Sequence, residues 1–446
     1  MRPEFPKVCV IGLGYIGLPT AALIAGRGLK VTGVDINPAV VATVSAGNIH
    51  IVETDLEDEV RNAVRSGCLT AREKPEAADI FVIAVPTPLS EDKRPVLDHV
   101  FAAAHALAPH LKRGNIVILE STSPVGTTEQ VAELLCERRR DLSFPTGPNA
   151  VSDPDVAIAY CPERVLPGRI LKELVENDRC VGGITPRCTA KARRFYELFV
   201  RGNCIETTAR TAEMVKLTEN AFRDTNIAFA NELSLICDRL EINVWELIEL
   251  ANLHPRVQIL KPGPGVGGHC IAVDPWFIVD AAPQEAQLIR AAREVNDGKA
   301  HYVLERIHKL IETHPDRPVS CLGLTFKGNV DDLRESPALA IVESLAEAYG
   351  DRIGVVEPFI KRLPDNLRAF GVRRQQLEEA LAASGILVLL VDHDVFRDVE
   401  ESRRIGAIIY DTRGVWHDAV PIAERSGGLG PQPASPLASR TAWRLQ

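Results

Sequence analysis

Short apolar runs alternate with helical patterns over the N-terminal half of the chain. The apolar runs cover residues 8–11, 31–34, 80–85 and 116–120, and each is short enough for one buried strand. Strands that alternate with helices in this way are typical of a doubly wound parallel sheet. We therefore predict an α/β domain of this class, with strand–helix units continuing to about residue 205.

A long helical pattern without Gly or Pro follows from residue 208 to residue 240. An unbroken helix of that length would extend roughly 50 Å at 1.5 Å per residue. Two further helices are predicted over residues 244–253 and 283–311, and Gly298 could interrupt the second. A helix as long as the first is typical of a segment that bridges domains or forms a dimer interface.

The last third of the chain repeats the pattern of the first. The sequence Cys321-Leu-Gly-Leu resembles Val10-Ile-Gly-Leu, and strands are predicted over residues 353–357, 386–392 and 407–413. This weak internal repeat predicts a second Rossmann-like domain that lacks the glycine fingerprint of the first.

The fold prediction is therefore two Rossmann-like doubly wound domains, joined by a long central helix and a helical dimerisation region. The predicted boundaries are residues 1–207, 208–314 and 315–425. Residues 426–446 are rich in Gly, Pro, Ser and Ala, which predicts a disordered tail. Residues 141–155 are rich in Pro, Gly, Asn and Asp, which predicts a surface loop.

Composition and charge narrow the classes of function. The 446 residues are too many for one compact core, which agrees with several domains. The formal net charge is −9 and no long basic run occurs, so nucleic-acid binding has little support. Ten cysteines without a CxxC spacing predict neither a metal site nor a redox dithiol. No signal-like segment and no apolar run of roughly 20 residues occur, so we expect a cytoplasmic protein with no membrane partner.

A dinucleotide-binding fingerprint follows the first predicted strand and opens a helix. Its residues are Gly12, Gly14, Tyr15, Ile16 and Gly17. The glycines allow a tight turn, the approach of a pyrophosphate and close packing of the helix on the sheet. Asp35 ends the second strand and would accept hydrogen bonds from the ribose hydroxyls. Residues 36–52 contain no Lys or Arg that could neutralise the charge of a 2′-phosphate, so NAD is predicted rather than NADP.

Proline and hydroxyl residues follow the next two predicted strands. Pro86 and Thr87 end one of them, and Thr122 and Thr128 follow the other. Ligands of parallel sheets bind at the carboxyl ends of the strands, so we predict that Pro86, Thr87 and Thr128 contact the cofactor. For Thr128 alone, helix capping is an equal alternative.

The segment Pro262–Trp276 is the most informative part of the chain for chemistry. It places Cys270 behind four glycines and places Asp274 four residues later. Glycines let the backbone approach a ligand closely, and a thiol at such a turn can act as a nucleophile. A structural cysteine is the alternative, but the glycines and Asp274 together favour catalysis.

The long helix carries polar residues on one face. Lys216 and Asn220 are spaced i,i+4 and therefore lie on the same side, with Arg223 within reach. Apolar neighbours of Lys216 favour a position that faces a pocket over the solvated position that is usual for lysine.

Two further charged residues are candidates with simple alternatives. Glu163 could be a general base for water, and the alternative is a surface carboxylate. Arg334 could contact a phosphate or the cofactor, and the alternative is a salt bridge with Asp331 or Glu335.

Taken together, these motifs resemble the UDP-glucose/GDP-mannose dehydrogenase family over nearly all of residues 6–416. The resemblance is carried by the segments Ala159–Gly168, Thr211–Asn220, His254–Val257 and Gly265–Phe277. These matches are long and far more specific than the glycine fingerprint alone.

The resemblance implies a four-electron oxidation of a UDP-sugar at C6 with two NAD⁺, for surface polysaccharide synthesis. UDP-N-acetyl-D-mannosamine is the leading substrate, and UDP-N-acetylglucosamine and UDP-glucose are the alternatives. The thiolate of Cys270 would form a thiohemiacetal and then a thioester, while Lys216 and Asn220 stabilise the oxyanion. The residues that would order or activate water are Asp274, Thr122 and Glu163.

The same resemblance implies a set of contacts with the UDP-sugar. The substrate-binding candidates are Arg164, Val165, Lys216, Asn220, Arg223, His254, Arg256, Gly267, Phe326, Lys327 and Arg413. In the family the residue that matches Arg256 comes from the partner subunit, which implies a homodimer or a higher homo-oligomer. Arg334 would contact the cofactor.

Two functions from other classes remain as alternatives. A two-electron hydroxyacid dehydrogenase would need no thioester, and Cys270 would then be structural. A non-enzymatic NAD-sensing protein would bind NAD without oxidising a sugar. We rank the second alternative last, because Lys216, Asn220, Cys270 and Asp274 would then have no purpose.

Overall fold

The computed structural model divides into two compact units. The first comprises Met1–Asn226 and Gly268–Glu294, and the second comprises Ile227–Gly267 and Val295–Gln446. The structure describes residues 7–51, 53, 55–147, 150–165, 168–268 and 270–416. The predicted tail at residues 426–446 lies outside these residues.

The first unit contains an eight-stranded sheet, counted over the described residues, in the order β3-β2-β1-β4-β5-β6-β7-β8. The strands are β1 (Val8–Ile11), β2 (Val31–Val34), β3 (Leu69–Arg72), β4 (Ile80–Ile83), β5 (Ile116–Leu119), β6 (Ala157–Tyr160), β7 (Arg179–Gly183) and β8 (Cys204–Thr208). From β3 to β6 all strands run parallel, which confirms the predicted doubly wound sheet. Strand β7 pairs antiparallel with β6, and β8 is parallel to β7, so the sheet is mixed at this edge.

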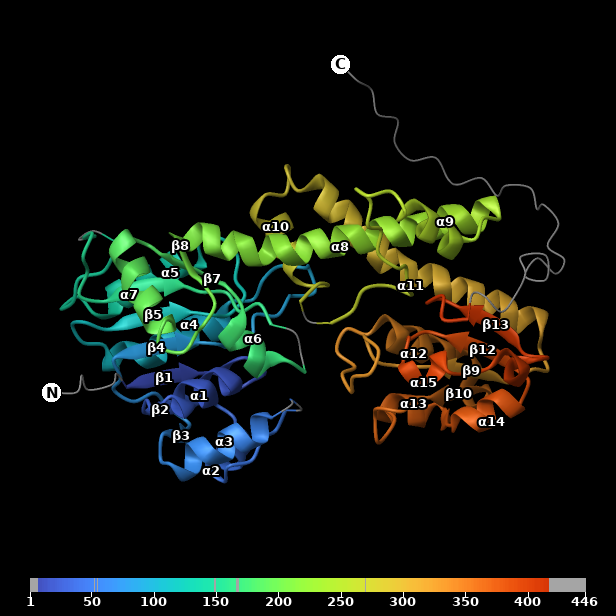
Figure 1. Cartoon of the computed structure of the whole chain (residues 1–446), viewed down its shortest axis with the longest axis horizontal. Helices are drawn as coiled ribbons and strands as arrows, with labels where there is room; N and C mark the ends of the chain where they lie inside the picture. Colours follow the sequence, from blue (N-terminus) through green and yellow to red (C-terminus); the bar gives the residue numbers. More distant parts are fainter. Residues whose placement is uncertain are drawn as a thin grey trace, which may run out of the picture. The chain divides into compact units, whose positions relative to one another are not determined.

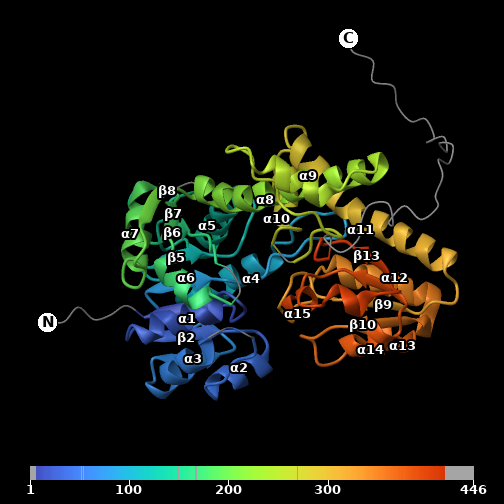
Figure 2. The ribbon, with the colours of Figure 1, turned by 45° about the vertical axis from the view of Figure 1, so that its right-hand side comes forward.

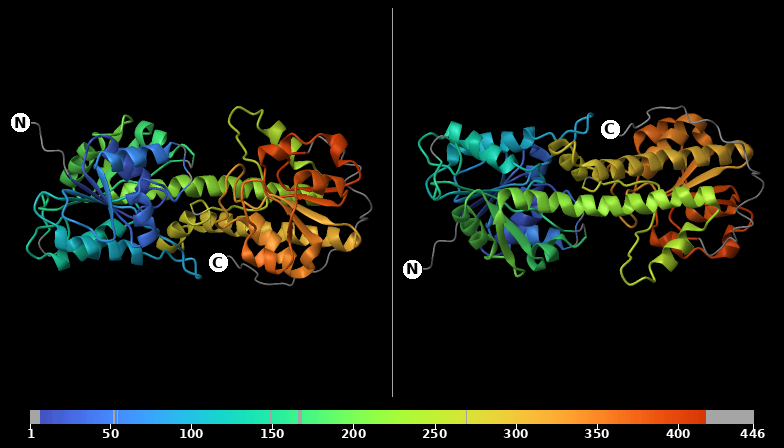
Figure 3. Two further views of the ribbon diagram at one scale, coloured as in Figure 1. Left: turned by 90° about the horizontal axis from the view of Figure 1, so that it is seen from below. Right: turned by 90° about the horizontal axis from the view of Figure 1, so that it is seen from above.

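Helices cover both faces of the first sheet (Figure 3). Apart from the two longest, the helices of this unit are α1 (Gly17–Gly26), α2 (Pro38–Ser45), α3 (Leu56–Arg65), α4 (Asp98–Leu107), α5 (Thr127–Arg138), α6 (Ile170–Glu176), α7 (Pro186–Tyr196) and α10 (Asp274–Ala281), with a 3-10 turn η1 (Ala108–His110). Alternate residues of β1 pack into different cores: Val8 and Val10 lie with α1, α3 and α7, whereas Cys9 and Ile11 lie with α4 and α5. Strands buried on both faces explain the uninterrupted apolar runs in the sequence.

Two long helices contribute residues to both units. Helix α8 (Ala209–Leu240) has 32 residues and agrees with the helix predicted over residues 208–240 (Figure 1). Helix α11 (Gln287–Thr313) continues through Gly298, so an interruption there is not observed. One glycine costs a helix only about 1 kcal/mol relative to alanine, which the packing of the other residues outweighs.

The second unit contains a five-stranded sheet among the residues that the structure describes, with all strands parallel (Figure 2). In sheet order the strands are β11 (Arg373–Arg374), β10 (Ile353–Val356), β9 (Val319–Leu322), β12 (Ile386–Leu389) and β13 (Ile408–Asp411). Its helical segments are α9 (Val244–Ala251), α12 (Pro337–Tyr349), α13 (Asp365–Ala369), α14 (Leu377–Ala382) and α15 (Asp394–Arg397), with 3-10 turns η2 (Gly350–Arg352) and η3 (Glu401–Arg404). Helix α12 packs into one core and α14 into the other, which is again a doubly wound arrangement.

The turn after the first strand is the same in both units. Gly12 has φ +95° and its N–H donates to the carbonyl of Val34 at 2.8 Å. Gly323 has φ +92° and its N–H donates to the carbonyl of Val356 at 2.9 Å. Positive φ is readily available only to glycine, so the repeated Gly-Leu pair in the sequence marks a repeated turn.

An acidic residue ends the neighbouring strand in each unit and accepts the next backbone N–H. The Leu13 N–H donates to Asp35 Oδ2 at 3.0 Å, and the Leu324 N–H donates to Glu357 Oε2 at 2.7 Å. Asp35 is half-buried, whereas Glu357 is buried. Asp35 and Glu357 therefore occupy equivalent positions in the two units, although their side chains differ in burial.

Replacing Gly298 by Ala should stabilise α11, because nothing lies within 4 Å of the position of the added Cβ. Alanine is favoured over glycine inside a helix by about 1 kcal/mol, so the midpoint of urea unfolding should rise. Gly17→Ala is the control: its Cβ would lie 1.8 Å from the carbonyl oxygen of Gly12, and the midpoint should fall. A lower midpoint for Gly298→Ala would contradict this account of the helix.

Candidate functional site

The glycine fingerprint forms a cradle at the start of α1. A Cβ on Gly12 would lie 2.4 Å from the carbonyl oxygen of Ala84, and one on Gly17 would meet the carbonyl oxygen of Gly12. Gly14 is exposed and has nothing within 4 Å of its Cβ position. Two glycines therefore permit the tight packing of turn and helix, and the third leaves open space for a pyrophosphate.

Asp35 is held beside this cradle by the backbone. Its Oδ2 accepts from the Leu13 N–H at 3.0 Å, and its Oδ1 accepts from the Asn37 N–H at 2.9 Å. The carboxylate is only half-buried, so its remaining lone pairs are available to ribose hydroxyls. Tyr15 and Ile16, also half-buried, complete the turn before α1. These residues fit an NAD adenosine diphosphate.

Hydroxyl groups join the carboxyl ends of β4 and β5. Ser121 Oγ accepts from the Val85 N–H at 2.9 Å and donates to the Val85 carbonyl at 2.7 Å. Thr87 Oγ1 donates to the carbonyl of Thr122 at 2.6 Å. Pro86 is exposed and Thr122 is half-buried at the same sheet edge. A role of these strand ends in cofactor binding stays a prediction, alongside their observed role in joining two strands.

Glu213 is an important residue that the sequence reasoning missed. Its buried carboxylate accepts from the N–H groups of Gly126 at 2.7 Å and Thr128 at 2.8 Å, and from the Thr128 hydroxyl at 2.6 Å. Burial raises the pKa of Glu213, and these three hydrogen bonds oppose that shift. Glu213 thus caps α5 and ties it to α8, three residues before Lys216. The signal in the sequence was an acid between apolar residues of a helix.

Asp274 joins the two parts of the candidate catalytic site. It is the first residue of α10, and its Oδ2 accepts from Asn220 Nδ2 of α8 at 2.5 Å. Its backbone N–H donates to the carbonyl of Cys270 at 2.8 Å, so Cys270 lies one turn before α10. Cys270 is half-buried, as is Lys216 one turn before Asn220. The predicted Lys216–Asn220 face is therefore directed toward the segment that carries the thiol.

Burial raises the pKa of Asp274 from 3.8 to about 6, against the opposing charge of Lys216 and the hydrogen bond from Asn220. The side chain is 2% exposed, so few water molecules can stabilise its charge. A carboxyl group that titrates near neutral pH can both accept and release a proton under physiological conditions.

Glu163 is a second buried carboxyl group in this unit. Burial raises its pKa, and the positive charges of Lys216 and Arg179 oppose this shift. Its Oε2 accepts from the Val165 N–H at 2.9 Å. The positive charge of Lys216 thus opposes the rise in pKa of both Glu163 and Asp274. The surface position that was the alternative for Glu163 is not observed.

A buried polar cluster, which the sequence reasoning did not find, lies behind Glu163. Tyr196 donates to Glu120 at 2.7 Å, Arg179 Nη1 lies 3.9 Å from the same carboxylate, and Arg179 also approaches Cys161 Sγ at 3.8 Å. Cys161 precedes Glu163 by two residues, so Arg179 contacts a side chain of the same segment. A charged residue at the start of an apolar strand was the available signal.

Arg164 lies at the edge of the same site. Its Nη1 donates to Oε1 of Glu219 at 2.7 Å, and its Nη2 donates to the carbonyl of Asp178. Glu219 precedes Asn220 on α8, so the guanidinium lies near the polar helix face. Arg223, one turn further along α8, is exposed.

The other predicted substrate residues belong to the second unit. His254 and Arg256 are exposed in the turn after α9, where the Arg256 N–H donates to His254 Nδ1 at 3.3 Å. A Cβ on Gly267 would lie 2.4 Å from the carbonyl oxygen of Glu335, so the chain requires glycine there. Arg334 is exposed and forms an ion pair at 2.6 Å. Its partner is Asp332, and neither of the two acids considered as alternatives forms this pair.

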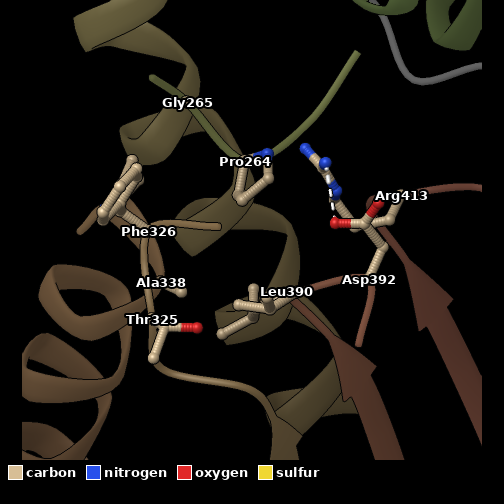
Figure 4. Close-up of a pocket in the computed structure, with 10 residues that line it drawn as sticks. Pro264, Gly265, Thr325, Phe326, Ala338, Leu390, Asp392 and Arg413 are labelled. Atoms are coloured by element: carbon tan, nitrogen blue, oxygen red, sulfur yellow. Dashed lines mark hydrogen bonds and ion pairs between the residues drawn. The ribbon is translucent and has the colours of Figure 1, made fainter. Parts of the chain in front are cut away.

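A small pocket in the second unit is lined by two of the predicted substrate residues, Phe326 and Arg413 (Figure 4). Its lining includes Pro264, Thr325, Phe326, Asp392 and Arg413. Arg413 Nη2 donates to Asp392 Oδ1 at 2.9 Å, which holds the guanidinium at the edge of the pocket. The other predicted residues of this unit, His254, Arg256, Gly267, Lys327 and Arg334, are not among those that line the pocket.

The described residues contain neither a metal-binding cluster nor a membrane-spanning helix. No group of three or more His, Cys, Asp or Glu side chains suited to a metal ion occurs among them. No helix in the described part of the chain has the length and apolar character needed to span a bilayer.

Three consecutive parts of the chain match one family. Residues 6–200 match the NAD binding domain of the UDP-glucose/GDP-mannose dehydrogenase family, residues 210–298 match its central domain, and residues 320–418 match its UDP binding domain.

Related proteins are similar to this chain over almost their full length. The chain is 58% identical over 413 residues to the NDP-N-acetyl-D-galactosaminuronic acid dehydrogenase of Ralstonia solanacearum, a match that covers 93% of this chain and 97% of that protein. It is 57% identical over 402 residues to the UDP-N-acetyl-D-mannosamine dehydrogenase of Campylobacter jejuni, covering 90% and 98%.

Solved structures agree with these relatives. The UDP-D-ManNAc dehydrogenase of Pyrococcus horikoshii is 36% identical with a TM-score of 0.81, and the match covers 92% of this chain and 96% of that one. The UDP-N-acetyl-mannosamine dehydrogenase of Staphylococcus aureus is 40% identical with a TM-score of 0.78, covering 92% and 95%. The chain therefore belongs to the UDP-glucose/GDP-mannose dehydrogenase family and is an NAD-dependent UDP-sugar dehydrogenase.

Proposed function

We propose that this protein oxidises C6 of UDP-N-acetyl-D-mannosamine from the alcohol to the carboxylate through a covalent intermediate on Cys270. The observation that carries the proposal is the position of Asp274, which bonds to Asn220 and to the backbone of Cys270. A thiol, an amide donor and a carboxyl group that titrates near neutral pH suit acyl chemistry. The product would enter surface polysaccharide synthesis.

The first steps form the bond to the enzyme. NAD⁺, when bound, accepts one hydride in each of two oxidations, so two molecules are used per sugar. The C6 hydroxyl loses its proton as the aldehyde forms, and Lys216 accepts this proton after its ammonium group has released one to water. The Cys270 thiolate then attacks the aldehyde carbon and yields a thiohemiacetal, which keeps the reactive aldehyde on the enzyme. Lys216 and Asn220 stabilise the oxyanion, and one such donor contributes about 3 kcal/mol.

The last steps release the product. The second oxidation converts the thiohemiacetal into a thioester, and water attacks its carbonyl carbon. Asp274, Glu163 and Thr122 are the candidates that order this water or accept its proton, and the thiol of Cys270 leaves. Because burial raises the pKa of both carboxyl groups, each holds a proton more readily than an exposed acid.

The UDP group is proposed to bind in the second unit, whose residues 320–418 match a UDP binding domain. Arg413 borders the pocket there, and Phe326 and Lys327 lie on the loop after β9. A guanidinium can bind two phosphate oxygens at once, which suits a diphosphate. Arg334, which is exposed, remains the candidate contact with the cofactor.

We also propose a homodimer formed through α8 and its neighbours. Phe222, Phe229 and Ile236 recur every seven residues and are 70%, 52% and 46% exposed. Large apolar side chains along one helix face are typical of a protein interface. The predicted dimerisation region at residues 208–314 contains this stripe and also Arg256, which would reach the site of the partner subunit.

A cytoplasmic location is proposed from the state of the cysteines. All ten lie within the described residues and none forms a disulfide. Reduced cysteines are usual in the cytoplasm.

A galacto-configured sugar is the second candidate substrate. The Ralstonia solanacearum relative, at 58% identity, is named for N-acetyl-D-galactosaminuronic acid. UDP-N-acetylgalactosamine should therefore be compared with UDP-N-acetylglucosamine and UDP-glucose as a substrate.

The substrate and the covalent route can be tested together by the yield of NADH from limiting amounts of each UDP-sugar. Two NADH per UDP-N-acetyl-D-mannosamine are expected from the wild type, and Cys270→Ser should abolish the second oxidation. Cys68→Ser, at another half-buried thiol of the same unit, is the control and should give the wild-type yield. One NADH per sugar, or turnover unaffected by Cys270→Ser, would leave a simple alcohol dehydrogenase.

Asp274→Asn should stabilise the protein above neutral pH. The folded-state pKa is about 6 and the ordinary value is 3.8, so the unfolded state loses the proton first as the pH rises. Ionisation of Asp274 therefore lowers the free energy of unfolding by up to about 3 kcal/mol. This loss develops between pH ~4 and ~6. Urea unfolding should show the variant more stable than wild type at pH 8 but not at pH 4. Asp280→Asn, at an exposed position of α10, should show no such pH-dependent gain.

Phe229→Asp should dissociate the proposed dimer, because it places a charge in the apolar stripe. Sedimentation velocity should then show the mass of one chain. Ile405→Asp is the control, since Ile405 is an exposed apolar residue outside the helical region and its substitution should leave the mass unchanged. A monomeric wild type would contradict the proposal.

A further inference from the structure

The loop after β9 in the second unit carries two of the proposed substrate contacts, Phe326 and Lys327. Thr325 is buried and Phe326 is half-buried, and both line the pocket of Figure 4. The Thr325 hydroxyl donates to the carbonyl of Lys327 at 2.8 Å, which tightens the loop. The shape of this loop therefore decides where the aromatic ring and the ammonium group are presented.

His393 is fully buried and holds the far end of this loop. Its Nδ1 accepts from the Asn329 N–H at 2.9 Å, so Nδ1 carries no proton. The ring proton must then be on Nε2, which lies 3.3 Å from Glu357 Oε2 and 3.4 Å from Thr325 Oγ1. Both of these oxygen atoms can accept a hydrogen bond. A neutral imidazole therefore has a donor for Nδ1 and an acceptor for the proton on Nε2.

Glu357 holds the near end of the same loop. Its Oε2 accepts from the Leu324 N–H at 2.7 Å, and its Oε1 accepts from the Phe359 N–H at 2.9 Å. Burial acts to raise the pKa of Glu357, but the hydrogen bonds from His393 and these N–H groups hold it below its ordinary value. The carboxylate and the imidazole thus form one buried unit with a bond to each end of the loop.

Neighbouring groups fix the imidazole and the residue that it binds. The ring stacks on Phe359 with centroids 4.8 Å apart and meets the edge of Phe396 at 5.4 Å. Asn329 has φ +61°, a left-handed conformation that asparagine adopts more readily than most residues other than glycine. Its side chain exchanges two hydrogen bonds with Asp394, at 2.7 and 3.0 Å. The loop end is therefore held in place by specific bonds from both the backbone and the side chain of Asn329.

The equivalent position in the first unit lacks this imidazole. Asp35 accepts the same kind of backbone N–H as Glu357, but it is half-buried and fits a ribose. In the second unit His393 donates to the carboxylate from within the protein. The acid that fits a ligand in one Rossmann-like unit thus supports a loop in the other.

We infer that His393 is a positioning residue that holds the loop 324–329 in the shape that binds uridine diphosphate. This inference rests on the proposed binding of UDP in the second unit. The essential contact is the bond from the Asn329 N–H to Nδ1, because it fixes the loop end that follows Phe326 and Lys327. Loss of this contact weakens the binding of UDP and leaves the binding of NAD unchanged.

Two amide substitutions separate the functions of the imidazole. In His393→Asn the side-chain oxygen can take the place of Nδ1 and accept from Asn329. In His393→Gln the amide reaches the place of Nε2 and can donate to Glu357, but it leaves the Asn329 N–H without an acceptor. The two variants are similar in chemistry and differ in which bond they preserve.

The test is calorimetric titration of the full-length protein and both variants with UDP and, separately, with NAD. His393→Gln should weaken UDP binding about tenfold, as expected when a partly buried N–H loses its acceptor. His393→Asn should stay within about twofold of the wild type. NAD affinity should not change in either variant. Equal UDP affinities for both variants, or an equal loss of NAD affinity, would overturn the inference.

The wild type alone provides a second test if His393→Gln does not fold. Hydrogen exchange of the Asn329 N–H should be slow before UDP is added, because its bond to buried His393 already protects it. Fast exchange that slows only after UDP binds would overturn the inference. A wild type that does not bind UDP would instead remove the proposed function, which makes the two failures distinguishable.

Discussion

Burial of carboxyl groups away from water is the constraint on which both units depend. A buried carboxylate is costly unless fixed donors surround it, so each one ties together the elements that supply those donors. Glu213 accepts three hydrogen bonds from the start of α5 and thereby fixes α8. The same helix presents Lys216 and Asn220, and Asn220 bonds to buried Asp274. The proposed chemistry thus rests on the groups that hold the helices in place.

The two Rossmann-like units show how one turn serves two purposes. Gly12 and Gly323 have nearly the same φ, and in both units the next residue donates its N–H to an acid at a strand end. Half-buried Asp35 keeps lone pairs available for a ribose. Buried Glu357 accepts a hydrogen bond from His393, and the loop that both residues hold lines a pocket in the second unit. The same backbone turn occurs in both units, and the side chains around it determine whether it binds a ligand or supports a loop.

Much of the fold was predictable because local signals agreed. The apolar runs correspond to β1, β2, β4 and β5, and the helix without glycine or proline corresponds to α8. The antiparallel pairing of β6 and β7 was not predicted, since an apolar run has the same appearance in either direction. The continuity of α11 through Gly298 depends on packing, which outweighs the small local preference against glycine.

The sequence by itself determined the chemical groups of this protein: the glycine fingerprint with Asp35, and the thiol of Cys270 four residues before Asp274. These signals are readable because turns and short spacings follow from local backbone geometry. Only the tertiary structure decided which distant groups meet, including the support of Asp274 by Asn220 and the cluster of Arg179 behind Glu163. The physical reason is that burial and neighbouring charge set the protonation of a carboxyl group, and both arise when remote segments pack together.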